Sequence, residues 1–190
     1  MKQYIESQFE QLSKQLLELK SESETVVKIA DMCVNALRNG HKVIWCGNGG
    51  SAAQSQHLAA ELVGRYKLDR PAMNSISLTV DTSNLTAIGN DYGYDVVFSR
   101  QLQGVGQSGD ILIGLSTSGN SKNVLLAFEM AKQKDIKTVA LVGARGGAMR
   151  DMADISLCVP ADTSAHIQEI HITVGHLICD LIEKSFYKGK

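Results

Sequence analysis

Short apolar runs alternate with helix-patterned segments through most of this 190-residue chain. Such alternation is typical of βαβ units, in which helices cover both faces of a buried parallel sheet. We therefore expect an α/β fold. The expected strands cover 42–46, 75–80, 111–115, 138–142 and 155–159, and the expected helices cover 51–64, 82–90, 121–134 and 166–186.

Two further helices are expected ahead of the first strand, within residues 3–37. Apolar residues recur there at spacings of three and four, first from Ile5 to Leu19 and then from Val26 to Leu37. The dipeptide Asn39-Gly40 follows as a helix stop. Because these helices stand outside the alternation, we predict that residues 1–40 are a helical oligomerisation prefix. Residues 41–190 would then form the α/β sandwich of a single domain.

Composition limits the classes of function. Hydrophobic residues make up 44% of the chain and charged residues 21%, and a formal net charge of −1 argues against a large nucleic-acid surface. No apolar run approaches the ~20 residues of a membrane span, and residues 1–6 hold no signal-peptide core, so we expect a cytoplasmic protein. The 4 cysteines form no CxxC pair, which predicts reduced, mostly buried thiols.

Two polar loops each close an apolar strand. The first covers 47–51 (Gly-Asn-Gly-Gly-Ser) and the second covers 116–121 (Ser-Thr-Ser-Gly-Asn-Ser). Parallel α/β sheets bind anionic ligands beyond the carboxyl ends of their strands, where glycines allow close approach and helix N-termini offer free N–H groups. The hydroxyls of the second loop exceed what capping a helix at Ser121 needs. We predict that both loops hold one phosphorylated ligand.

The first loop taken alone also fits a dinucleotide site. Gly47, Gly49 and Ala52 match the GxGxxG/A pattern, and Asp81 ends the next expected strand, where it could bind a ribose. A tight turn without a ligand is equally compatible with this loop. A nicotinamide site would leave the hydroxyl loop and the polar helix faces described below without a role, which disfavours an oxidoreductase.

Polar residues on two expected helices point to acid–base or metal chemistry. His57 and Glu61 lie on one helix face, where they can share a divalent metal or relay a proton, although this spacing also fits a surface ion pair. On the last helix, Gln168 and His176 lie off the apolar stripe, and His57 with Glu61 could be their partners. His171 lies near that stripe and is expected as a core histidine with satisfied hydrogen bonds.

Five blocks of this sequence together resemble the bacterial phosphoheptose isomerases, which are sugar-isomerase (SIS) domain enzymes. In chain order they are Cys-Gly-Asn-Gly-Gly-Ser at 46–51, His-x-x-x-Glu-Leu-x-Gly-Arg-Tyr at 57–66, Gly-Asn-Asp at 89–91, Ser-Thr-Ser-Gly-Asn-Ser at 116–121 and Ile-Gln-Glu-x-His-x-x-x-x-His at 167–176. The resemblance covers nearly the whole chain. It implies a flavodoxin-like five-stranded parallel sheet and a homotetramer with active sites between subunits. The implied reaction converts sedoheptulose 7-phosphate to D-glycero-D-manno-heptose 7-phosphate, for the heptose of lipopolysaccharide or capsule.

The resemblance also implies a set of site residues and one zinc ion per subunit. Carried over by position, the zinc ligands fall on His57, Glu61, Gln168 and His176. The sugar-phosphate contacts fall on Asn48, Gly49, Gly50, Asn90, Asp91, Ser116, Thr117, Ser118, Ser121 and Gln168, while Ser51 and Arg65 match family blocks that line the pocket. Ala165 and His166 depart from the family, in which an acidic residue sometimes and an arginine often stand there, and these changes bear on substrate affinity.

Isomerisation through an enediol needs a base at the C–H bond and an acid at the carbonyl oxygen. We assign the base role to Glu61, which would also contact the substrate, and the acid role to His176. Metal coordination weakens a carboxylate as a base, so Glu61 could be ligand, base or both. The alternatives are an isomerase of another sugar phosphate and a non-catalytic SIS adaptor of the kind that associates with the replication initiator DnaA. Those adaptors lack the paired Glu and second His, so their presence here favours an enzyme.

Overall fold

A five-stranded parallel sheet organises the computed structural model, which describes residues 1–187. The spatial order of its strands is β2-β1-β3-β4-β5, with Val43 of β1 paired to both Ser75 of β2 and Ile111 of β3. This order confirms the expected flavodoxin-like sheet. The strands are β1 (Val43–Gly47), β2 (Ser75–Ser77), β3 (Ile111–Ser116), β4 (Lys137–Val142) and β5 (Ile155–Cys158).

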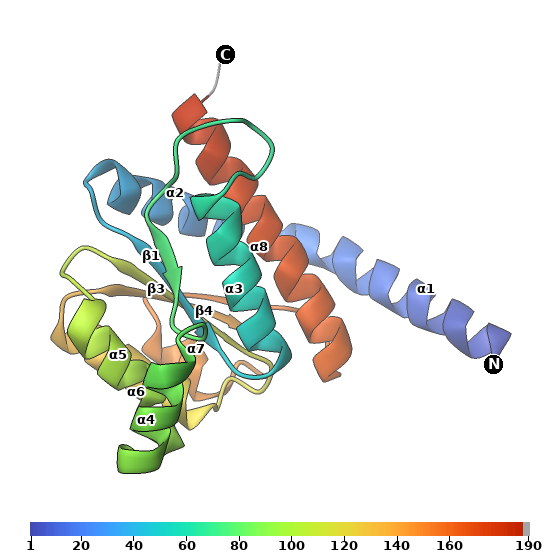
Figure 1. Cartoon of the computed structure of the whole chain (residues 1–190). Coiled ribbons are helices and arrows are strands. Elements are labelled where there is room, and N and C mark those ends of the chain that lie inside the picture. The colour runs from blue at the N-terminus through green and yellow to red at the C-terminus, as the bar shows by residue number, and fades with distance from the viewer. Residues whose placement is uncertain (188–190) are drawn as a thin grey trace.

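Helices cover both faces of the sheet, which explains why its strands are continuous apolar runs. Along β1, Val43 and Trp45 belong to one core, while Ile44 and Cys46 belong to the other. The first face is covered by α2 (Ser23–Arg38), α3 (Gly50–Val63) and α8 (Ser164–Tyr187), and the second by α4 (Thr82–Tyr92), α5 (Val97–Val105), α6 (Lys122–Gln133) and α7 (Gly147–Met152) (Figure 1). None of the described helices is both long and apolar enough to cross a membrane.

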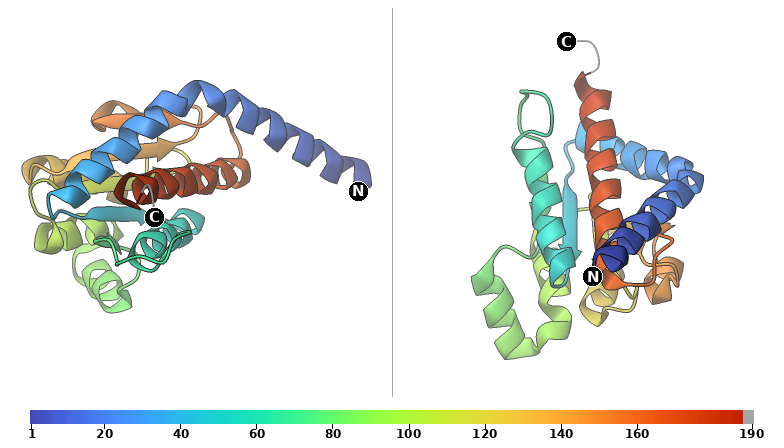
Figure 2. Two further views of the ribbon diagram at one scale, coloured as in Figure 1. Left: turned by 90° about the horizontal axis from the view of Figure 1, so that it is seen from above. Right: turned by 90° about the vertical axis from the view of Figure 1, so that its right-hand side faces the viewer.

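The N-terminal helical extension leaves the body of the molecule. Helix α1 (Lys2–Glu18) joins α2 through a 3-10 turn, η1 (Leu19–Glu22), and projects beyond the sheet layers (Figures 1 and 2). It contains no buried residue, and its apolar side chains Tyr4, Ile5 and Phe9 are exposed. A lone helix of this length is marginal in water. We call Tyr4, Ile5 and Phe9 the exposed apolar row of α1, and this row is a candidate contact surface.

The structure differs from the sequence-based expectation in several connections. Helices α5 and α7 and the 3-10 turn η2 (Tyr94–Val96) were not predicted. Helix α7 is too short to show a clear helical period, whereas α5 has an apolar face at Val97, Phe98 and Leu102 that the prediction overlooked. The strand expected at 75–80 ends at Ser77. There the Ser77 and Thr79 hydroxyls bond each other, and Thr79 Oγ1 donates to the Ala52 carbonyl, so the chain turns toward α3.

The topology places both predicted ligand loops at one point. Strands β1 and β3 are neighbours, yet the chain leaves β1 through α3 on one face and β3 through α6 on the other. Such a switch point opens a crevice beyond the carboxyl ends of the strands. Gly47 and Leu115 are register partners at those ends. Loops 47–51 and 116–121 therefore border the same crevice.

Candidate active site

Helix α3 packs along α8 (Figure 1). Two histidines and a glutamate from these helices converge there. His57 Nε2 lies 2.9 Å from His176 Nε2 and 3.2 Å from Glu61 Oε1. Ligand atoms of all three residues lie within 4.8 Å of one another. We call these residues the His57–Glu61–His176 trio. The structure thus brings together three of the four residues for which metal ligation was expected.

The donor set of the trio fits a divalent metal. Two ring nitrogens that face each other at 2.9 Å cannot both carry protons, so at least one lone pair points into the trio. Two imidazoles and a carboxylate are a common protein ligand set of catalytic zinc, which keeps a further position open. Burial, and then the neighbouring His57, lower the pKa of His176 against an opposing effect of Glu61. A lowered pKa favours the neutral ring, which is the form that binds metals.

The Gln168 side chain lies over the first loop. Its side-chain amide is so close to Gly50 that a Cβ at that position would come within 2.8 Å of Gln168 Cδ. Its backbone carbonyl accepts a hydrogen bond from Gln54 Nε2. Gln168 precedes His176 by about two helical turns, or about 12 Å along α8. The amide is placed to contact a ligand at the N-terminus of α3, and its role as a metal ligand stays a prediction.

The hydroxyls of the second loop bond to one another and to the loop backbone. Ser116 Oγ lies 2.8 Å from Ser121 Oγ and accepts the Gly119 N–H at 3.1 Å. Ser118 Oγ accepts the Asn120 N–H at 3.1 Å. Ser121 is the N-cap residue of α6, but its side chain makes no capping hydrogen bond. The hydroxyls thus gather at the N-terminus of a 12-residue helix, a position that favours anions.

Asn48 ties the first loop to the elements beside the second. Its side-chain amide exchanges two hydrogen bonds of 2.8 Å with the Asn123 amide, near the start of α6. The Tyr94 hydroxyl donates to Asn48 Oδ1 at 3.2 Å. Asn48 is therefore held in place before any ligand arrives.

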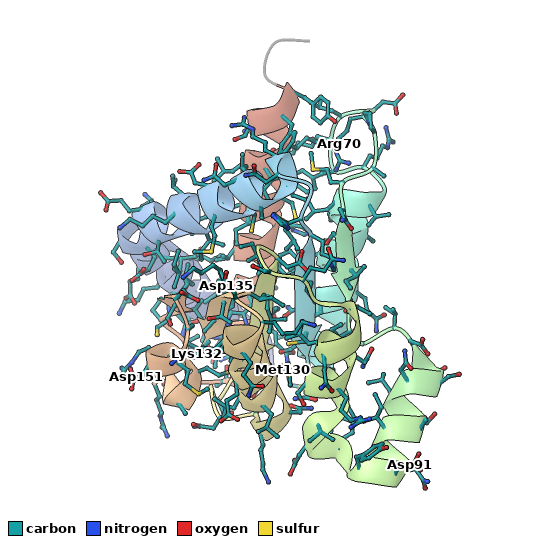
Figure 3. The ribbon with its side chains drawn as sticks, turned by 90° about the vertical axis from the view of Figure 1, so that its left-hand side faces the viewer. Arg70, Asp91, Met130, Lys132, Asp135 and Asp151 are labelled. Carbon is teal, nitrogen blue, oxygen red and sulfur yellow. The ribbon has the colours of Figure 1, made fainter. Side chains whose placement is uncertain are left out.

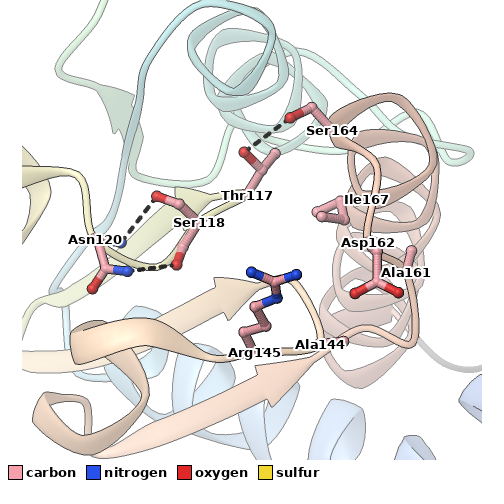
Figure 4. Close-up of a pocket in the computed structure, with 9 residues that line it drawn as sticks. All are labelled: Thr117, Ser118, Asn120, Ala144, Arg145, Ala161, Asp162, Ser164 and Ile167. Atoms are coloured by element: carbon pink, nitrogen blue, oxygen red, sulfur yellow. Dashed lines mark hydrogen bonds between the residues drawn. The ribbon is translucent and has the colours of Figure 1, made fainter.

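A cavity of about 310 Å³ opens beside the second loop (Figure 4). The guanidinium of Arg145 reaches into this cavity between Ser118 and Asp162, and Arg145 makes no ion pair within residues 1–187. Arg145 was not among the predicted site residues, although it follows β4 and therefore lies at the carboxyl end of a strand, as the two loops do. The polar lining residues are Thr117, Ser118, Asn120, Arg145, Asp162 and Ser164.

The remaining expected site residues are spread over the molecule. Asn90 and Asp91 are exposed near the end of α4, where Asn90 Nδ2 donates to Asp91 Oδ1 at 2.8 Å. Figure 3 shows Asp91 at the outer tip of that helix, away from the sheet. Arg65 is exposed just after α3, and Ser51 is buried in its first turn. A single chain therefore does not bring Asn90 and Asp91 to the trio.

His171 is buried in the core, but its hydrogen bonds are not satisfied as expected. Its side chain is 0% exposed, and neither ring nitrogen has a hydrogen-bond partner within the described residues. Burial lowers the pKa of His171 from 6.5 to about 4, against a smaller opposing effect of the Val142 backbone. The folded protein therefore holds this ring neutral in mildly acidic solution, where an unfolded chain would protonate it.

We expect the free energy of unfolding to fall by about 3 kcal/mol as the pH drops from near 6.5 to near 4, because only the unfolded state takes up the His171 proton. Urea unfolding at a series of pH values measures this slope. His171→Phe keeps an aromatic ring without a titrating group, and its unfolding should lack that part of the pH dependence. An unchanged slope in the variant would show that other groups cause the acid sensitivity.

Comparison with known proteins places the chain in a family. The SIS-domain profile matches residues 3–143. An Akkermansia muciniphila protein named phosphoheptose isomerase is 55% identical over 189 residues, which cover 100% of both chains. Phosphoheptose isomerase structures from Francisella tularensis and Neisseria gonorrhoeae match with TM-scores of 0.92 and 0.91, at 38% and 41% identity; each match covers 96% of this chain and 97% or 98% of the other. The chain therefore belongs to the phosphoheptose isomerase family of SIS-domain proteins.

Proposed function

We propose that this isomerase converts sedoheptulose 7-phosphate to D-glycero-D-manno-heptose 7-phosphate, with the His57–Glu61–His176 trio as its acid–base centre. The observation that carries the proposal is the convergence of a carboxylate and two imidazoles within 4.8 Å, beside a crevice bordered by two polar loops. The product would supply heptose for lipopolysaccharide or capsule, and the protein would work in the cytoplasm.

The trio can perform the proton transfers of both halves of the reaction. Glu61 takes a proton from C1 of the ketose while His176 protonates the carbonyl oxygen at C2, which forms the enediol. Glu61 then returns a proton to C2, while His176 takes up the proton of the C1 hydroxyl to leave the aldehyde, and both side chains regain their starting protonation. A bound zinc ion would polarise the reacting oxygens as a Lewis acid. In that case Glu61 would have to act as a base despite its contact with the metal.

The proposal includes one zinc ion per subunit and a homotetramer. His57, Glu61 and His176 would hold the ion, and Gln168 joins them only through the family resemblance. The exposed apolar row of α1 supports association of subunits. Active sites between subunits would also give a role to Asn90 and Asp91, which a single chain leaves at the tip of α4. Residues 1–40 would be the oligomerisation prefix of a single domain.

Arg145 would strengthen phosphate binding from the cavity beside Ser118. A charge-assisted hydrogen bond contributes about 1.5–3 kcal/mol, so we expect Arg145→Ala to raise KM about tenfold with kcat nearly unchanged. Steady-state kinetics measure both constants. Arg150→Ala is the control, because Arg150 pairs with Asp151 and lies outside the cavity lining. Equal KM values for the two variants would remove Arg145 from substrate binding.

The function is tested by incubating metal-depleted protein with sedoheptulose 7-phosphate, with and without added zinc, while NMR follows the aldose. We expect the aldose to form, and to form faster with zinc. A folded protein that makes no aldose in either state would contradict the proposal. That outcome would favour an isomerase of another sugar phosphate or a non-catalytic SIS adaptor.

A further inference from the structure

A buried ion pair lies beside the C-terminal end of α3. Arg70 Nε donates to Glu183 Oε2 at 3.0 Å, and the two side chains are 1% and 2% exposed. Removing two charges from water is costly, and a buried pair often stabilises a fold no better than apolar residues of the same size. The contacts of this pair with the backbone near the trio suggest a role other than stability.

Glu183 holds the backbone of the segment that follows α3. Its Oε1 accepts the N–H groups of Lys67 and Leu68 at 3.0 and 3.1 Å, and its Oε2 lies 3.4 Å from the Tyr66 nitrogen. Burial alone would raise the pKa of Glu183, but the backbone N–H groups and Arg70 lower it below its usual value. One ionised side chain of α8 thus fixes the backbone around Tyr66 through charge-assisted hydrogen bonds.

Arg70 holds the last turn of α3. Its guanidinium donates from Nη1 to the Leu62 carbonyl and from Nη2 to the Glu61 carbonyl, each at 2.8 Å. Carbonyls in the last turn of a helix lack partners within the helix. Arg70 supplies a partner to both of these carbonyls, and the Met73 N–H also donates to the Leu62 carbonyl. Arg70 therefore fixes the backbone of the residue whose carboxylate belongs to the trio.

Tyr66 connects this segment to His176. The two ring centroids are 5.8 Å apart with an angle of 30° between the ring planes. The His57 ring also contacts His176, edge-on, with a centroid distance of 5.1 Å. His176 is thus bounded by two rings, and the backbone that carries Tyr66 is held by Glu183.

We propose that Glu183 and Arg70 are positioning residues for the trio. Through Tyr66 they fix the His176 ring, and through the Glu61 carbonyl they fix the end of α3, so that three donor atoms meet at one divalent cation. The proposed effect of Glu183 and Arg70 on cation binding depends only on the positions of the three donor atoms. The consequence for catalysis rests on the isomerase function proposed above.

Co²⁺ alone is the probe, titrated into the metal-depleted full-length protein while its visible absorption is recorded. Glu183→Gln directs an NH₂ group toward Arg70 or a backbone N–H, and Tyr66→Leu removes the ring but keeps an apolar side chain. We expect both variants to bind Co²⁺ about 10- to 100-fold more weakly, with a changed absorption band. Asp180→Asn is the matched control. Asp180 lies on the same helix, but within residues 1–187 it accepts hydrogen bonds from the side chains of Lys67 and Lys184 and from no backbone group, so this variant should behave as wild type.

Wild-type Co²⁺ affinity and absorption in folded Glu183→Gln and Tyr66→Leu proteins would overturn the proposal. So would a wild-type protein that binds no Co²⁺. If Glu183→Gln does not fold, Tyr66→Leu decides, because its substitution leaves the buried ion pair intact. A wild-type protein that binds Co²⁺ and loses affinity in both variants, yet never isomerises sedoheptulose 7-phosphate, would refute the proposed function and support this inference.

Discussion

Replacing Glu61 by glutamine should lower the turnover of sedoheptulose 7-phosphate about 10²- to 10⁴-fold, the range that a general base contributes. Glutamine keeps the size of the side chain and can still donate or accept a hydrogen bond, but it cannot take a proton from carbon. The Glu61 side chain contacts His57, while its backbone carbonyl is held by Arg70 whatever side chain is present. The fold and the oligomeric state should therefore stay as in wild type.

The measurement is the initial rate at saturating zinc, so that weaker metal binding by the variant does not imitate the loss of a base. Glu169→Gln is the matched control, because Glu169 is exposed next to Gln168 on α8. We expect this control to retain wild-type activity. A Glu61→Gln protein with a near-normal rate would remove Glu61 from the proton transfer.

Replacing Gly119 by alanine should destabilise the fold by about 2–4 kcal/mol and weaken phosphate binding. Gly119 has φ +67°, and a Cβ there would collide with the Gly146 carbonyl group, 2.6 Å from its carbon. The obstacle is backbone, so no side-chain rotation relieves the contact. The Gly119 carbonyl also accepts the Met149 N–H at 2.9 Å, which ties the second loop to α7. Relief of the collision therefore has to move the loop that carries the hydroxyls.

Urea unfolding and calorimetric titration with inorganic phosphate measure the two effects. Gly104→Ala is the control, because a Cβ at this helical position meets nothing within 4 Å. That variant should be as stable as wild type or about 0.5–1 kcal/mol more stable. Unfolding of Gly119→Ala at the same urea concentration as Gly104→Ala would contradict the steric argument.

The sheet was predictable because each strand is covered on both faces, and double burial leaves a continuous apolar run in the sequence. The short helix α7 was not predicted because it has too few buried residues to leave a pattern in the sequence. Helix α7 (Gly147–Met152) spans 6 residues and buries only Met149, so it carries no period. The early end of β2 depends on the Thr79 hydroxyl reaching the Ala52 carbonyl. A contact between distant segments cannot be found from local pattern.

The same distinction applies to the candidate site. His57 and Glu61 were found together because a spacing of four residues fixes two side chains on one helix face. Placing His176 beside them needed the further argument that a polar residue on a buried helix requires a partner. The hydrogen bond from Arg70 to Glu183 joins residues 113 positions apart in the chain, so no local sequence pattern predicts it. Arg145 stands alone after β4, without the run of glycines or hydroxyls that marks the other two loops.

The most direct test of the acid–base centre is isomerisation of sedoheptulose 7-phosphate in D₂O, followed by NMR at C2 of the aldose. If Glu61 carries a proton to the enediol and that proton exchanges with solvent, the wild-type product should contain deuterium at C2. Glu61→Gln should then form both product and exchanged substrate about 10²- to 10⁴-fold more slowly than wild type. Conversion at the full rate by both proteins, with the C1 hydrogen moved to C2 and no deuterium incorporated, would contradict the proposed mechanism.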